Sequence, residues 1–119
     1  MDLFDTTELA LKRATQAVSL RQQVIAENLA NSNTPGYRRR DVNFQDALTS
    51  AIADGKSALE NLQFTPEVDR TQPLRGDGSN VDVDKEQSAM AQVSLQYDAL
   101  TAVMKSRMQI MRMVIGGGA

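Results

Sequence analysis

Apolar residues form two long stripes with helical spacing, one toward each end of the chain. Toward the amino terminus, Leu11, Val18 and Ile25 recur every seven residues. Spacings of three, four and seven residues place side chains on one face of an α-helix. The pattern predicts a helix from about Thr6 to Ala30, with Asp5 as its N-cap.

The stripe toward the carboxyl terminus is the most regular pattern in the chain. Its members follow one another at spacings of three or four residues, as in the seam of a coiled coil. They are Met90, Val93, Tyr97, Leu100, Met104, Met108, Met111 and Ile115. Two successive spacings of four, on either side of Met104, interrupt the strict heptad. We predict a long helix with Asp84 as its N-cap, pairing along this seam.

A run of short polar residues is expected to end the first helix. Asn31 competes for local hydrogen bonds, and Pro35 disfavours the helical conformation in the residue before it. Proline suits the second position of a tight turn, and glycine at positive φ suits the third. The sequence therefore predicts a turn with Pro35 and Gly36 at its centre.

The middle of the chain is less regular. Phe44, Leu48 and Ile52 repeat every four residues and predict a short helix that ends at Gly55. From Gly55 to Asn80, prolines, glycines and scattered apolar residues favour a loop or short strand over a helix. We interpret this segment as an insert that is flexible or ordered by a partner.

Together these elements predict a mainly α-helical protein. Residues 1–34 are expected to form an amphipathic helix, 35–80 a turn, a short helix and a flexible middle insert, and 81–119 a coiled-coil-like helix. The two terminal helices would pair as a coiled-coil-like hairpin around a polar, partly irregular middle. A chain of 119 residues offers little else to bury such stripes, so the pattern favours assembly over catalysis.

Composition restricts the possible chemistry. The chain has no Cys and no His, which excludes disulfides, the usual zinc sites and acid–base catalysis by histidine. The acids between Asp77 and Glu86 do not have the ligand spacing of a calcium-binding loop, and the glycine required at the sixth position of such a loop is missing. No phosphate loop or nucleophile motif accompanies them. We expect no cofactor, no metal and no enzymatic activity.

Charge and hydropathy bear on partners and location. A net charge of −2 and a pI near 5.0 argue against nucleic acid as a partner. The run Arg38-Arg39-Arg40 is a local exception, interpreted as a solvated cluster or a contact for an acidic partner. Arg75-Gly76-Asp77 spells an adhesion tripeptide in a glycine-rich turn, where chance explains it best. No segment approaches the roughly 18 apolar residues of a membrane span, and the first ten residues lack a cleavable secretory signal.

Four segments resemble, in order and spacing, the bacterial flagellar basal-body rod proteins. They are Asn28-Leu29-Ala30-Asn31, Thr34-Pro35-Gly36-Tyr37, the block from Asp77 to Glu86, and Tyr97-Asp98-Ala99-Leu100. The first two are shared by rod, hook and related axial proteins. The short length and the acidic block are most similar to proximal rod proteins, although Ser79 stands where the family more often has a second Asn.

The resemblance implies a structural subunit whose terminal helices pack on each other and on neighbours, forming a torque-transmitting axial tube. It implies an assembly turn made by Asn28, Asn31, Thr34, Pro35, Gly36 and Tyr37. The implied partners are other rod subunits, rotor-base adaptor proteins and, transiently, the flagellar type III export gate. The implied location is the rod, in the periplasmic space, reached without a cleaved signal peptide.

Phe44 and Leu48 resemble the Phe-x-x-x-hydrophobic element by which early axial proteins dock on the export gate. A packing pair at helical i, i+4 spacing explains them equally well. Two other readings of the whole chain remain open. One is another axial subunit of rod or hook, and the other is a helical export chaperone or regulator. An enzyme would need a concave site with converging polar groups.

Overall fold

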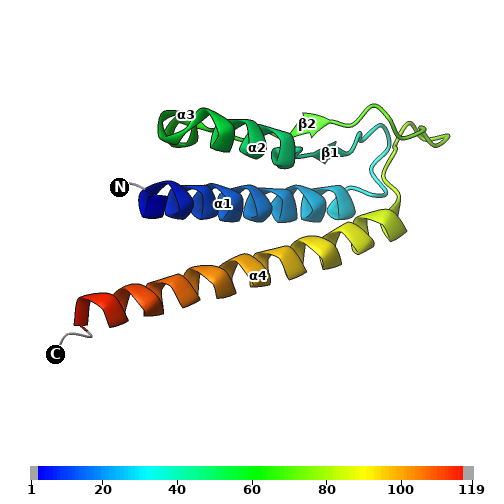
Figure 1. Cartoon of the computed structure of the whole chain (residues 1–119). Helices are drawn as coiled ribbons and strands as arrows, with labels where there is room; N and C mark the ends of the chain where they lie inside the picture. Colours follow the sequence, from blue (N-terminus) through cyan, green and yellow to red (C-terminus); the bar gives the residue numbers. More distant parts are fainter. Residues whose placement is uncertain (1–2, 117–119) are drawn as a thin grey trace.

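The computed structural model describes residues 3–116 and places one long helix, α1, between two layers (Figure 1). One layer holds two short helices and a pair of two-residue strands, and the other is a single helix, α4, antiparallel to α1. The elements in chain order are α1 (Leu3–Ala30), β1 (Arg40–Asp41), α2 (Phe44–Asp54), α3 (Lys56–Asn61), β2 (Glu67–Val68) and α4 (Val83–Gly116). The predicted fold, mainly helical with paired terminal helices, is confirmed.

The molecule is elongated. Its principal extents are 66 × 27 × 14 Å and its radius of gyration is 18.0 Å, whereas a compact domain of this length has a radius of gyration of about 14 Å. An elongated helical chain buries a smaller share of its apolar surface than a compact one. Much of α4 therefore stays in contact with solvent.

The core lies where α1 packs on α4 and on the segment after the turn. Val18 and Ile25 of α1 meet Val93 of α4, and all three side chains are buried. The other buried members of this cluster are Ala17, Val24, Val42 and Phe44. Burying each aliphatic side chain contributes about 1.5–3 kcal/mol, so this cluster fixes which faces of α1 and α4 meet.

Three side-chain contacts define the antiparallel register of α1 and α4. Asn28 contacts Glu86 at 3.3 Å, Gln22 contacts Ser94 at 3.4 Å, and the Thr15 hydroxyl lies 3.3 Å from the Met104 sulfur. The two helices diverge toward the carboxyl end of α4 (Figure 1).

Both predicted N-caps are wrong. Helix α1 begins at Leu3, so Asp5 lies inside the helix. Helix α4 begins at Val83, and the Asp82 carboxylate accepts hydrogen bonds from the backbone N–H of Asp84 (3.0 Å) and Lys85 (3.2 Å). A cap must stand one residue before the helix to reach these donors, and Asp82 occupies that place.

Helix α2 ends at Gly55 as predicted, but helix α3 was not predicted. Arg13 of α1 explains it, because its guanidinium donates to the carbonyl oxygens of Leu59 (2.8 Å) and Glu60 (2.9 Å) at the end of α3. Leu59 is fully buried. A six-residue helix is unstable alone, so contacts with α1 hold a helix that the local sequence does not indicate.

The rest of the middle segment also folds back onto the chain. Strand β2 pairs antiparallel with β1, with Arg40 opposite Val68 and Asp41 opposite Glu67. The expectation of a loop or short strand over a helix therefore holds from Leu62 to Asn80 and is wrong for Lys56–Asn61, which form α3. The sequence pattern predicts an insert that is flexible or ordered by a partner, whereas the structure places α3 and β2 in this segment, in contact with α1 and β1 of the same chain.

Candidate functional site in the turn and along the helix seam

The turn after α1 has the predicted geometry. Gly36 has φ +79°, and the Tyr37 N–H donates to the Thr34 carbonyl at 3.2 Å, which closes a four-residue turn around Pro35 and Gly36. The Thr34 hydroxyl donates to the Asn31 side chain at 3.2 Å. A side chain at residue 36 would be strained because L-residues rarely adopt this φ.

A second turn packs directly against the first. The Gly36 N–H donates to the Asp77 carbonyl at 2.8 Å, and a Cβ on Gly78 would lie 3.3 Å from the Gly36 Cα. Arg75 donates to the carbonyls of Ser32 and Val81. The Arg-Gly-Asp tripeptide thus holds two turns together, and its charged side chains have partners within the chain.

Asn28 connects the end of α1 to this pair of turns. Its side chain is fully buried. The carboxamide oxygen accepts from the Tyr37 hydroxyl and from the Arg40 N–H, both at 3.0 Å, and the nitrogen donates to the Arg40 carbonyl at 2.8 Å and to Glu86 at 3.3 Å. Four hydrogen bonds saturate an amide side chain, so another residue here would leave buried groups unpaired.

Arg39 and Glu86 form the charged centre of the same region. Glu86 is 1% exposed, and Arg39 donates to Glu86 through Nε and to Asp69 through Nη1. Asn80 accepts from the Arg39 N–H at 2.7 Å and donates to the Asp69 carbonyl at 2.8 Å. We call this network the clasp; its members are Asn28, Tyr37, Arg39, Asp69, Asn80 and Glu86.

The interpretation of the arginine run as a solvated cluster is wrong for its central residue. Arg39 is largely buried because its acidic partners, Glu86 and Asp69, belong to the same chain. Arg38 is exposed, and Arg40 forms a surface ion pair with Glu27. The run therefore contributes one buried cation and two surface cations.

The pKa values in the clasp reflect this pairing. Burial by itself would lower the pKa of Arg39, but the hydrogen bonds and charge of Glu86, with those of Asp69 and Asp41, leave it raised. Burial would raise the pKa of Asp69, yet hydrogen bonds from Thr71 and Arg39 hold it below its ordinary value of 3.8. Both groups are therefore held in their charged forms.

The clasp was missed in the sequence, although one signal was present. Glu86 precedes Val93 by seven residues, and Val93 precedes Leu100 by seven. The acid therefore occupies a seam position of α4, where a charge requires a buried partner. Nothing in the local sequence identifies that partner as Arg39, which lies 47 residues away.

The structure divides the predicted seam into a covered and an uncovered part. Val18, Ile25 and Val93 are buried, and Leu11, Met90, Leu100 and Met104 are partly buried. The remaining members, Tyr97, Met108, Met111 and Ile115, are exposed. Val93 is fully buried, whereas Met108, Met111 and Ile115 near the carboxyl end are 53%, 38% and 82% exposed.

The two residues resembling an export element lie on α2. Phe44 is buried, and its ring meets Phe64 edge to face with a centroid distance of 6.5 Å, while Leu48 is partly buried. The i, i+4 pair therefore packs in the folded chain. In this state the Phe44 ring is hidden from a docking protein.

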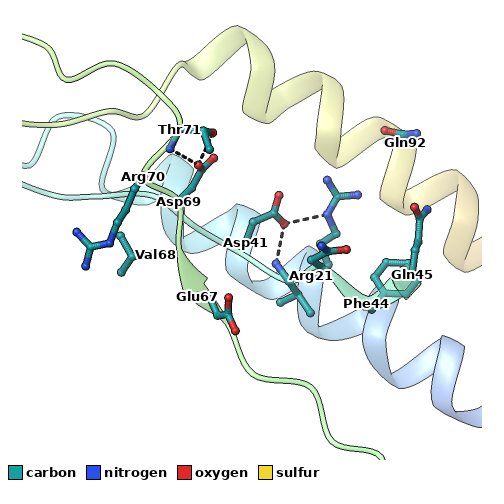
Figure 2. Close-up of a pocket in the computed structure, with 12 residues that line it drawn as sticks. Arg21, Asp41, Phe44, Gln45, Glu67, Val68, Asp69, Arg70, Thr71 and Gln92 are labelled. Atoms are coloured by element: carbon teal, nitrogen blue, oxygen red, sulfur yellow. Dashed lines mark hydrogen bonds and ion pairs between the residues drawn. The ribbon is translucent and has the colours of Figure 1, made fainter. Parts of the chain in front are cut away.

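A hollow of about 600 Å³ lies beside β1 and β2. Figure 2 shows that two of its three carboxylates are already engaged, Asp41 with Arg21 at 3.0 Å and Asp69 with Thr71, while Glu67 is the third. Groups that are paired with one another do not converge on a ligand. Between residues 3 and 116 no cluster of acids has the arrangement of a metal site, and no helix there is long and apolar enough to cross a membrane.

Comparison with known proteins identifies relatives over nearly the whole chain. A family model described as "Flagella basal body rod protein" matches residues 9–38. The flagellar basal body rod protein FlgB of Bacillus subtilis is 33% identical, and the alignment covers 99% of both chains. The chain belongs to the flagellar basal body rod protein family. The FlgB proteins of Escherichia coli and Salmonella typhimurium are 29% and 30% identical over 98% of this chain and 99% of theirs.

Membership confirms the resemblance seen in the sequence, and the chain is a structural subunit of the flagellar basal-body rod. The family match at residues 9–38 covers most of α1 and the turn up to Arg38. The match of this rod protein to the family model therefore includes two members of the clasp, Asn28 and Tyr37, and ends one residue before a third, Arg39.

We expect Glu86→Gln to lower the free energy of unfolding of this rod protein by about 3 kcal/mol, because it removes the charge that faces buried Arg39. The matched control is Glu27→Gln, which loses a surface ion pair with Arg40 and should cost less than about 1 kcal/mol. Urea unfolding followed by circular dichroism measures both. Equal stabilities of the two variants would contradict the clasp.

Asp69 gives the clasp a defined response to acid. Because its folded pKa is lowered, its contribution is present at neutral pH and is lost as the pH falls through that pKa. Asp69→Asn should be less stable than the parent by about 2 kcal/mol at pH 7. The difference should shrink as the pH falls below 3.8, the ordinary value, and through the lowered folded pKa of Asp69. A constant difference across this range would show that the Asp69 charge contributes nothing.

Proposed function

We propose that this chain polymerises through its two terminal helices into the axial tube of the rod, in a structural and non-catalytic role. The observation that carries the proposal is the change in exposure along the α4 seam. Val93 is fully buried against α1, whereas Met108 and Ile115, on the same stripe, face solvent. A long apolar stripe that continues past its partner is typical of a surface covered by a neighbouring subunit.

A torque-transmitting tube also needs subunits that do not deform. The clasp supports this role, because a fully paired polar network in a low-dielectric interior permits few alternative arrangements of the elements it joins. Here it joins the end of α1, the strand pair and the start of α4. The turn residues Asn28 and Tyr37 therefore act by orienting α4, and the exposed Pro35 is free to contact a neighbour.

The partners and location are parts of the same proposal. We infer contacts with other rod subunits and with rotor-base adaptor proteins, in the portion of the basal body that crosses the periplasmic space. A different axial subunit is the nearest alternative. It is less favoured because relatives named as rod proteins align end to end with this chain. An export chaperone is the alternative from another class, and it would form a small closed oligomer instead of a rod.

Delivery without a cleaved signal peptide, through the flagellar export gate, completes the proposal. In the folded chain Phe44 is buried, so docking through Phe44 and Leu48 would be confined to chains that have not folded. Folding after export would then withdraw the docking element into the core.

Met111→Asp tests polymerisation through the α4 seam. Met111 is exposed in the single chain, so the variant should keep its far-ultraviolet circular dichroism spectrum while losing rods and motility by at least tenfold, because a charge would be buried between subunits. Gln109→Asp is the control and should assemble, because Gln109 is exposed and is not spaced three, four or seven residues from any member of the α4 seam. Normal motility of the Met111 variant would argue against the seam as a subunit contact.

A comparison of the single variants Phe44→Ala and Phe64→Ala separates a role in docking on the export gate from a role in packing of the core. The two rings contact each other at the core, where Phe44 is buried and Phe64 partly buried, so both substitutions should remove core packing. Only Phe44 belongs to the docking element. In a strain blocked at rod assembly, the periplasmic pool of the Phe44 variant should fall severalfold below that of the Phe64 variant. Equal pools would leave Phe44 as a packing residue.

A further inference from the structure

The methionines of this chain are concentrated in α4. After the first residue, every methionine lies in that helix: Met90, Met104, Met108, Met111 and Met113. The chain has no Cys, so no thiol competes with these thioethers for an oxidant. A mild oxidant such as hydrogen peroxide should therefore react with this protein on α4.

Two of these side chains are shielded within the subunit. Met90 is partly buried and packs against the apolar cluster that contains Val93. Met104 is also partly buried, and its sulfur lies 3.3 Å from the Thr15 hydroxyl inside the contact between α1 and α4. An oxidant must reach the sulfur to react with it, so Met90 and Met104 should react slowly.

The remaining methionines are exposed, but they lie on two sides of α4. Met108 and Met111 belong to the seam, in the part that α1 leaves uncovered. Met113 is 66% exposed and follows them by five and two residues, spacings that place it on the opposite side of a helix. Exposed thioethers are thus present both on the seam and away from it.

We propose that Met108 and Met111 are a redox modification site that controls polymerisation of this rod protein, with hydrogen peroxide as the oxidant. The inference rests on the proposed function, because it assigns a regulation to the same seam. Each thioether sulfur attacks one peroxide oxygen, so that an S–O bond forms and the O–O bond breaks. Sulfur loses two electrons, the second oxygen leaves as hydroxide and takes the proton from the first, and the products are methionine sulfoxide and water.

The sulfoxide changes the surface that a neighbouring subunit would cover. A thioether is apolar and adapts its shape to a partner, whereas a sulfoxide carries a polar oxygen. Burying that oxygen between subunits without a hydrogen-bond donor is unfavourable. Oxidation of the free subunit should therefore prevent assembly. The fold of the subunit should survive, because neither Met108 nor Met111 belongs to the buried core.

Peptide mass spectrometry of the purified free subunit tests the chemistry. Dilute hydrogen peroxide should convert Met108, Met111 and Met113 to sulfoxides about threefold faster than Met90 and Met104. The far-ultraviolet circular dichroism spectrum should stay unchanged. Equal rates at the exposed and the shielded positions would overturn the proposal.

Glutamine variants test the effect of polarity on assembly without an oxidant, because glutamine is close to methionine sulfoxide in length and also carries a polar oxygen. The double variant Met108→Gln/Met111→Gln should form about fivefold fewer rods than the parent. Met113→Gln is the matched control and should assemble. Normal assembly of the double variant would refute the seam contact, and with it the proposed function. Equal loss in Met113→Gln would overturn the assignment to Met108 and Met111.

The oxidant itself is tested in cells that lack methionine sulfoxide reductases, so that sulfoxides persist. The chain is induced during exposure to sublethal hydrogen peroxide, and rods are counted in purified basal bodies. Rods of the parent should fall about fivefold, whereas Met108→Leu/Met111→Leu, which is apolar and forms no sulfoxide, should be unaffected. Returning the reductases should restore the rods of the parent.

Three results would overturn the redox site while leaving the proposed function intact. One is an equal loss of rods in the parent and in the leucine variant. Another is normal assembly of parent subunits that carry sulfoxide at Met108 and Met111, or the absence of sulfoxide from both residues. The third is a loss of parent rods that the reductases do not reverse.

Discussion

A buried carboxylate organises this molecule. Glu86 enters the interior where α4 begins to pack on α1, and a charge there is tolerated only when it is paired and its hydrogen bonds are satisfied. The Arg39 guanidinium supplies the opposite charge, and the Asn28 side chain donates a hydrogen bond to the Glu86 carboxylate. Because these partners come from separate parts of the chain, the pairing forms only when α1, the turn, the strand pair and α4 are in place together.

The same requirement explains the shape of the subunit. The clasp and the apolar cluster around Val93 hold one half of α4 against α1, and the two helices separate toward the carboxyl end of α4. The free half of α4 is apolar on two sides, through Met108 and Met111 on one side and through Val103 and Ile110 on the other. This arrangement suits a subunit in which one half of α4 is held by its own chain and the exposed half is left to contact neighbouring subunits.

Sequence patterns predicted what depends on periodicity and on local turn chemistry. The α1 and α4 stripes, the end of α2 at Gly55 and the positive φ of Gly36 follow from spacing or from a single residue type. The patterns did not predict features that depend on a contact between residues far apart in the sequence. Helix α3 forms because Arg13 holds its last carbonyls, and Arg39 is buried because Glu86 lies opposite it. The cap of α4 was missed by two residues, because Gln87, three residues after Asp84, suggested a capping box that does not form there.

We infer that the clasp orders the first half of α4 within the single chain, while neighbouring subunits in the rod cover the second half. Amide hydrogen exchange, compared between the free subunit and purified basal bodies, measures this most directly. We predict that residues 86–100 are protected in both states, and that residues 104–116 exchange rapidly in the free subunit and become protected in the rod. Equal protection of the two halves in the free subunit, or no gain at residues 104–116 on assembly, would contradict it.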